Sequence, residues 1–349
     1  MTANFTEYLN KFSEQEWLAA VEKLLPEIHE VDRNAIQIWF RFYPLSLFRF
    51  LETAENREEA IRKFAIQGDF ELKNQIDSSH KFIFGHRFWK ETKAAIVAHS
   101  ESKTNEIGDL AVEVTEIAKE VAKTAKTKEC LTKAIVLAGL MTLVQVGIEA
   151  FKAATGEILI DAKQAKKSAK EIIEERAKDD SQGVFGFLKT INKKFSVCYD
   201  EAESYASFKI INEEEIATAS GKDQTKDWKA MDERRWEGVI PVECRSASCG
   251  TCWVGVLGGQ EKLSEVSPRE RRQMKVFGYN QTEDEKPFIR LACQAKAYGN
   301  ATIVIPTWNG VFGKKIYGNV ELLELEPATT SAVKLRETIA EAAGKPNKS

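Results

Sequence analysis

The sequence has few cysteines for its length, and this scarcity excludes a fold that is held together by disulfides. Only six occur among 349 residues, whereas disulfide-rich chains are short and contain more than about 8% cysteine. The six are also unevenly placed, because four of them lie between residues 244 and 293. The composition therefore predicts a multidomain protein with a single cysteine site.

An excess of charge of either sign is missing as well. The 50 basic and 53 acidic residues leave a formal net charge of −3 at pH 7. Proteins that bind nucleic acid through an electrostatic surface carry a basic excess, so we expect no nucleic-acid partner. Hydrophobic residues make up 43% of the chain, which is enough to fill a core and excludes global disorder.

Long hydrophobic runs are absent too. The longest, residues 134–144, falls short of the roughly 20 apolar residues of a membrane span, and Lys133 and Glu149 limit its extension. We expect a buried helix near 131–151, with membrane contact through a hairpin as the less favoured alternative. Residues 1–17 lack the basic and apolar segments of a signal peptide, so the expected location is cytoplasmic.

Helical periodicity dominates the first half of the sequence. Apolar residues from Ile107 to Val121 recur every three or four positions, which predicts a helix that packs on other helices. The helices expected at 131–151 and 161–178 are its predicted neighbours, and this region also offers a surface for oligomer formation.

Beyond residue 200 an alternating pattern replaces the helical one. We expect strands at 205–211, 253–257 and 301–306, a hairpin partner for the first strand at 215–219, and a helix at 225–237. The predicted regions are an aromatic-rich helical region (1–100), a helical bundle (101–180), a linker (181–202), a domain of mixed strands and helices (203–326) and a tail with a short helix (327–349). The fold class is therefore a multidomain chain, all-α at its N-terminus and α+β at its C-terminus.

Four cysteines of the C-terminal domain have the spacing of an iron–sulfur site. Cys244, Cys249 and Cys252 form a C-x4-C-x2-C motif, and Cys293 follows in the sequence Leu-Ala-Cys-Gln. Four thiolates are what a [2Fe–2S] cluster needs, two for each iron. The small residues between the first three cysteines allow backbone N–H groups to approach the sulfurs, which helps to set the reduction potential.

With this motif and this order of elements, residues 203–326 resemble a plant-type [2Fe–2S] ferredoxin domain with the β-grasp fold. The resemblance implies that Cys244 and Cys249 bind one iron of the cluster, and that Cys252 and Cys293 bind the other. It also implies an electron carrier and not an enzyme, with a reductase and an electron acceptor as partner proteins. Since every iron position would be filled, the implied chemistry is outer-sphere transfer of one electron, at a potential near about −400 mV.

Two features depart from the plant-type pattern. Ala247 stands where many members have glycine, so a positive φ at this position would strain the loop. The interval from Cys252 to Cys293 is also long. We expect its additional residues to form a surface helix around 267–275 and a loop around 281–285.

Other interpretations of the cysteines remain. A zinc site with four cysteines is possible, although such sites favour two C-x2-C pairs and this sequence has one. A pair of disulfides is disfavoured in the cytoplasm. Cys130 and Cys198 are predicted to be ordinary thiols, because a second cluster would need four more ligands.

The helical region resembles no family that its motifs identify, and two alternative functions depend on it. It contains no glycine-rich dinucleotide loop, which disfavours a fused reductase. As alternatives to an electron carrier, the protein would be a regulator whose cluster state controls partner binding, or an enzyme with a second metal or haem site near His80 and His86. These histidines are six residues apart, which is not the spacing of one helix face. A basic cluster lies beside the cysteines in the sequence, at Arg269, Arg271, Arg272 and Lys275. An ordinary solvated helix face is its favoured interpretation, and docking to an acidic partner is the functional alternative.

Overall fold

The computed structural model describes residues 5–103, 108–178, 193–279 and 286–318. Its contacts form two compact units. The first, which we call the helical unit, comprises Met1–Arg57, Asp69–Lys178 and Tyr199–Ala206. The second, which we call the sheet unit, comprises Glu58–Gly68, Asp179–Cys198 and Ser207–Ser349. Each unit therefore includes a short segment from the other half of the sequence.

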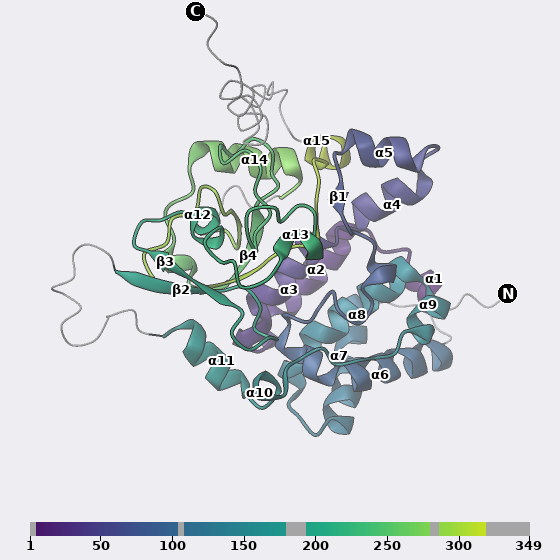
Figure 1. The fold of residues 1–349 in the computed structure, drawn as a ribbon. Helices are drawn as coiled ribbons and strands as arrows, with labels where there is room; N and C mark the ends of the chain where they lie inside the picture. Colours follow the sequence, from purple (N-terminus) through teal and green to yellow (C-terminus); the bar gives the residue numbers. More distant parts are fainter. Residues whose placement is uncertain (1–4, 104–107, 179–192, 280–285, 319–349) are drawn as a thin grey trace, which may run out of the picture. The chain divides into compact units, whose positions relative to one another are not determined.

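The helical unit is built from α-helices joined by short 3-10 turns (Figure 1). The helices are α1 (Phe5–Leu9), α2 (Glu14–Leu24), α3 (Glu30–Phe42), α4 (Leu45–Thr53), α6 (Trp89–Ser102), α7 (Leu110–Thr124), α8 (Lys133–Val146), α9 (Ile148–Ala153), α10 (Ala162–Ala165) and α11 (Ala169–Arg176). The 3-10 turns are η1 (Leu25–Glu27), η2 (Leu72–Asn74), η3 (Phe84–Phe88) and η4 (Glu129–Leu131).

Helix α8 is the buried centre of this unit. Its residues are buried from Lys133 to Val144, and it packs against α3, α6 and α7. This confirms the predicted buried helix. Among the residues that the structure describes, no helix combines the length and the apolar character that crossing a membrane requires.

The predicted apolar stripe of α7 is also buried. Leu110, Val114, Ile117 and Val121 face the interior, while Ile107 lies outside the described residues. The single helix predicted over 161–178 is wrong, because this stretch forms the two short helices α10 and α11. Helix α11 has its principal contact with α3, where Ala169 and Ile172 are buried against Val31.

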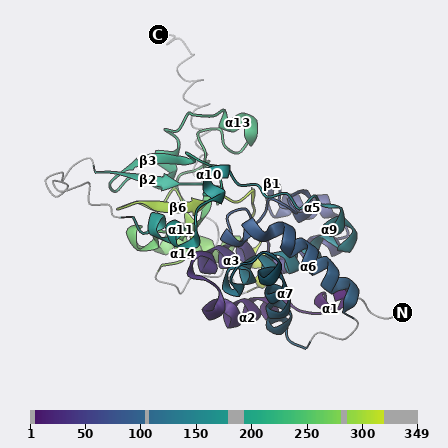
Figure 2. The same ribbon diagram turned by 90° about the horizontal axis from the view of Figure 1, so that it is seen from below.

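The sheet unit contains a five-stranded mixed sheet with the strand order β3-β2-β6-β4-β5. Its strands are β2 (Lys194–Cys198), β3 (Ser207–Ile211), β4 (Trp253–Gly258), β5 (Ile289–Leu291) and β6 (Ala301–Val304). Strand β2 pairs antiparallel with β3, which lies beside it in both views (Figures 1 and 2), and parallel with β6. Strand β4 pairs antiparallel with β5 and β6.

Short helices complete the sheet unit: α12 (Ile216–Ser220), α13 (Trp228–Met231), η6 (Gln260–Lys262), α14 (Pro268–Phe277) and α15 (Gly313–Tyr317). A mixed sheet with helices confirms the α+β class expected for the C-terminal region, and the helical unit confirms the all-α class expected for the N-terminal region. Helix α14 confirms the predicted surface helix. The predicted loop at 281–285 and the predicted tail at 327–349 lie outside the described residues.

Two predicted elements of this unit are wrong. The hairpin partner of β3 is β2, so residues 194–198 of the predicted linker belong to the sheet. The predicted partner at 215–219 instead lies in α12, whose apolar residues are buried. Of the helix predicted over 225–237, only α13 forms. The chain after α13 is a loop, because the buried Arg234 guanidinium donates hydrogen bonds to Asp232 and Asn309.

A second, two-stranded sheet brings an early segment of the chain into this unit. Helix α5 (Arg57–Lys63) leads into β1 (Gln67–Gly68), which pairs antiparallel with β7 (Trp308–Asn309). Gly68 has φ +79°, and a Cβ atom there would lie 2.4 Å from the Thr307 carbonyl oxygen. Only glycine fits this close approach of two backbones.

Candidate metal centre

The sheet brings the fourth cysteine to the other three. Cys252 directly precedes β4, and a single residue, Ala292, separates the end of β5 from Cys293. The two strands are paired with Trp253 opposite Leu291, and the Ala292 N–H donates to the Cys252 carbonyl at 2.9 Å. This register places two cysteines that are distant in sequence side by side.

The loop that carries the first three cysteines has an unusual backbone. Arg245, Ala247 and Gly250 have φ values of 54°, 61° and 64°. Ala247 therefore has the positive φ that the sequence analysis considered strained for alanine. A Cβ atom at Gly250 would lie 1.9 Å from the Phe277 ring of α14, so this position requires glycine for space as well as for conformation.

This backbone directs hydrogen-bond donors at the Cys244 sulfur. The N–H groups of Ser246, Ser248 and Cys249 donate to it over 3.4, 3.3 and 3.3 Å. At the other sulfurs, the Thr251 hydroxyl donates to Cys249 at 3.1 Å and the Gln294 amide donates to Cys293 at 3.5 Å. Such donors stabilise a thiolate and the negative charge of a thiolate-bound cluster.

The four sulfurs form two contacting pairs. The Cys249 thiol donates to Cys244, which lowers the pKa of Cys244 to about 3 and raises the pKa of Cys249. In the same way, the Cys252 thiol donates to Cys293, which lowers the pKa of Cys293 and raises that of Cys252. The pairs are the ones that the ferredoxin resemblance assigns to the two irons.

The spacing of the sulfurs favours a binuclear cluster over a single metal ion. Around one zinc ion, Zn–S bonds of about 2.3 Å place all four sulfurs about 3.8 Å apart. Within the described part of the chain, only one group of three or more candidate metal ligands has all its ligand atoms within 4.8 Å of one another, and it consists of His99, Glu113 and Glu116. No three of the four cysteine sulfurs are therefore as close together as a single zinc ion requires. The cysteines therefore fit two irons, with one pair of sulfurs for each, better than a zinc ion.

The two sulfur pairs differ in exposure. Cys244 and Cys249 are partly exposed, whereas Cys252 and Cys293 are buried. Solvent therefore reaches the site at Cys244 and Cys249.

A buried ion pair links α14 to the strand before Cys293. Both carboxylate oxygens of Glu270 accept from the Arg290 guanidinium, at 2.9 and 3.0 Å, and both side chains are almost fully buried. Glu270 also accepts from the Leu291 N–H at 2.8 Å, and Arg290 donates to the Ser264 carbonyl at 2.9 Å. Sequence analysis missed this pair, because nothing in the spacing of Glu270 and Arg290 joins them.

The two histidines of the helical unit are buried and in contact, but their nitrogens are occupied. The two Nδ1 atoms are 3.0 Å apart, His80 Nε2 lies 3.1 Å from the Ile76 carbonyl, and His86 Nε2 accepts from the Leu159 N–H at 2.9 Å. Neutral rings satisfy every contact if His86 donates through Nδ1 and His80 through Nε2. Burial lowers the pKa of both, that of His86 to about 4. This geometry leaves no lone pair for a metal, so it does not support the second cofactor site considered at His80 and His86.

The converging residues His99, Glu113 and Glu116 form an ion-pair network between α6 and α7. Glu113 accepts from His99 at 2.8 Å and from the Lys103 ammonium at 2.6 Å. The ammonium lies 3.9 Å from Glu116 as well. A cationic side chain already balances these carboxylates, so the network has a structural explanation.

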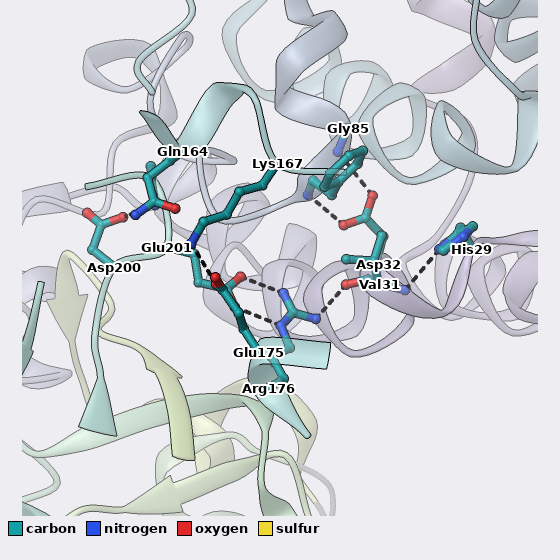
Figure 3. Close-up of polar contacts among 12 residues, drawn as sticks. His29, Val31, Asp32, Gly85, Gln164, Lys167, Glu175, Arg176, Asp200 and Glu201 are labelled. Atoms are coloured by element: carbon teal, nitrogen blue, oxygen red, sulfur yellow. Dashed lines mark hydrogen bonds and ion pairs between the residues drawn. The ribbon is translucent and has the colours of Figure 1, made fainter. Parts of the chain in front are cut away.

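A second polar network of the helical unit surrounds the buried Asp32 and Arg176 (Figure 3). Asp32 accepts from the N–H groups of Phe84 and Gly85 at 2.6 and 3.1 Å, and burial raises its pKa to about 6. Arg176 binds both oxygens of Glu201 and the Val31 carbonyl. The adjacent cavity of about 10 Å³ has room for one water molecule, so this network anchors the segment that carries Glu201 and does not form a ligand pocket.

Comparison with known proteins identifies the C-terminal region. Residues 212–298 match the family of the 2Fe-2S iron-sulfur cluster binding domain, and this range contains all four cysteines. No solved structure matches the chain. The C-terminal region therefore contains a ferredoxin-type domain that binds a [2Fe–2S] cluster, as the sequence analysis predicted. The helical N-terminal region lies outside the match.

Proposed function

We propose that the protein carries single electrons between a reductase and an acceptor enzyme, on a cluster held by Cys244, Cys249, Cys252 and Cys293. The match to a 2Fe-2S binding domain implies electron transfer. When bound, the cluster accepts or releases one electron without an open coordination position. The observation that carries the assignment of ligands is the arrangement of the four sulfurs in two pairs, with backbone donors directed at Cys244.

The chain's own residues prepare this site. The loop from Cys244 to Cys252 orients its N–H groups toward sulfur, so charge on the sulfurs is stabilised without movement of the protein. Trp253 and Phe277 are buried and pack edge to face, with ring centres 5.9 Å apart, and the Phe277 ring lies against Gly250 of the loop.

The proposal is tested by a reductive titration of the full chain, followed by visible absorption and EPR spectroscopy. We expect bleaching of the visible bands by one electron per chain and a rhombic EPR signal from the reduced cluster. Cys293→Ser should damage these signals as severely as Cys249→Ser, whereas the matched control Cys130→Ser should retain them. Intact signals in Cys293→Ser would show that another residue is the fourth ligand.

We propose docking or assembly as the role of the helical unit, and the cytoplasm as the location. The first part is tested by comparing the oligomeric state and partner binding of the full chain in both oxidation states. Rapid reoxidation of the reduced chain by an acceptor enzyme supports a carrier. Association that depends on oxidation state without such turnover supports the regulatory alternative.

A further inference from the structure

The sheet unit has a hollow directly beside the partly exposed sulfur pair. Its volume is about 340 Å³, and its lining consists of Thr218, Gly221, Lys222, Trp236, Glu237 and Arg245. Arg245 is the residue next to Cys244, so one wall of the hollow continues into the cysteine loop. The hollow therefore lies at the more exposed side of the site, where the distance for electron transfer to a partner is shortest.

The walls of the hollow are fixed by close packing and by ion pairs. Gly238 lies so near the end of α12 that a Cβ atom would be 2.4 Å from the Ser220 carbonyl oxygen. Arg245 donates to the Thr218 hydroxyl at 3.0 Å and pairs with Glu237. A hollow with such walls keeps its shape before a partner arrives, which reduces the entropic cost of binding.

The ion pairs around the hollow are oriented with their positive ends outward. Lys222 pairs with Glu214, and the lysine side chain is 55% exposed while the glutamate is 13% exposed. Arg245 is 34% exposed, whereas its partner Glu237 is 9% exposed. An approaching molecule therefore meets an ammonium and a guanidinium group, with the carboxylates behind them.

We propose that this hollow is the docking point of the redox partner, which places a carboxylate from an acidic segment between Lys222 and Arg245. The inference rests on the proposed electron-carrier function and adds the place and the charge of the contact. Trp236 offers an aromatic surface beside the two cations, and tryptophan is favoured at the centres of protein interfaces. Charge complementarity at this point would bring the partner close to Cys244 and guide its approach.

The first experiment measures the binding of a fluorescently labelled hexaglutamate peptide to the cluster-loaded full chain by anisotropy. Lys222→Gln removes one exposed cation of the hollow. At an ion-pair separation of about 4 Å in water, one unit charge changes the affinity for a carboxylate about fivefold. Lys229→Gln is the matched control, because Lys229 is exposed on α13 and does not line the hollow. We expect about fivefold weaker binding for Lys222→Gln, and no change for the control.

The second experiment follows reoxidation of the dithionite-reduced chain in a stopped-flow instrument. The oxidants are the anionic cobalt(III)–EDTA complex and the cationic hexaamminecobalt(III) ion, each of which accepts one electron from the reduced chain. We expect Lys222→Gln to slow the anionic reagent about threefold at low salt, to accelerate the cationic one, and to lose both effects above roughly 0.5 M salt. Hexaglutamate should compete with the anionic reagent in the wild type.

Equal effects of Lys222→Gln and Lys229→Gln would overturn the docking proposal, because only the total charge would then matter. Absence of peptide binding by the wild type would overturn it as well. Neither result would affect the visible bands and the EPR signal, on which the electron-carrier function depends. Conversely, the absence of the visible bands and the EPR signal would contradict the carrier function, whether or not the hexaglutamate peptide binds.

Discussion

The buried pair of Glu270 and Arg290 leads to the sharpest prediction about stability. It joins the inserted helix α14 to the strand that leads to Cys293, and neither side chain is exposed to more than 3%. Removing one partner from a buried ion pair leaves a charge without compensation, at a cost of about 3–5 kcal/mol. The single variants Arg290→Met and Glu270→Met should each lose this much, which raises the unfolded fraction more than about a hundredfold.

The double variant should lose much less than the sum of the two. It leaves no buried charge, so the main remaining losses are the hydrogen bonds from the Leu291 N–H and to the Ser264 carbonyl. Each unsatisfied backbone group costs about 1–3 kcal/mol, and two of them cost about 2–6 kcal/mol. A double-mutant cycle should therefore give a coupling energy of about 3 kcal/mol or more.

The assay is equilibrium unfolding in urea, monitored by the near-ultraviolet signal of the packed aromatic residues, together with the rate of cluster loss. Glu261→Gln, an exposed residue outside this pair, is the control and should leave both quantities unchanged. Additive losses in the cycle would refute the reasoning, because the buried charge that is left without a partner in each single variant is absent from the double variant.

Three further predictions concern the cysteine loop and the helical unit. Ala247→Gly should stabilise the folded chain by about 1 kcal/mol in urea unfolding, because glycine adopts φ 61° without strain; a destabilised variant would contradict this. Gly250→Ala should abolish cluster incorporation, measured as iron per chain, since its Cβ would overlap the Phe277 ring; normal iron content would show that the ring can move. Asp32→Asn should make the loss of stability in acid steeper between about pH 4 and pH 6. Because the pKa of Asp32 is raised, the folded chain binds a proton at Asp32 between about pH 4 and pH 6, and this contribution to stability is lost as pH rises. The lowered pKa of His86 has the opposite effect, since it is the unfolded chain that binds the additional proton. Unfolding curves at several pH values that match the wild type would contradict the assignment.

The parts of the site that the sequence predicted are those that local chemistry dictates. The spacing of Cys244, Cys249 and Cys252 is a property of one loop. The sequence alone left open whether Ala247 has a positive φ, and the structure shows that it does. Helix α8 was predictable because Ala134 to Val144 are apolar apart from Thr142, so no face of this stretch is suited to water.

The features that the sequence did not predict depend on contacts between distant segments. Strand β2 is five residues long and alternates, but its neighbours β3 and β6 decide that it belongs to the sheet. The loop after α13 follows a helical pattern in sequence, yet the buried Arg234 binds Asn309 and the Thr307 carbonyl and prevents a helix. Local periodicity contains no information about such partners.

The occupied nitrogens of His80 and His86 illustrate the same limit. Two histidines close in sequence suggest metal ligands, but one of their hydrogen-bond partners, Leu159, comes from a distant segment. Only the folded chain shows that their lone pairs and protons are already used.

The most direct test of the central claim is the metal and sulfide content of the purified full chain. Iron, acid-labile sulfide and zinc would be measured together in the wild type, in Cys293→Ser and in Cys130→Ser. We predict two iron atoms and two sulfides per chain in the wild type and in Cys130→Ser, with loss of both in Cys293→Ser. One zinc ion per chain, without iron or sulfide, would contradict the account.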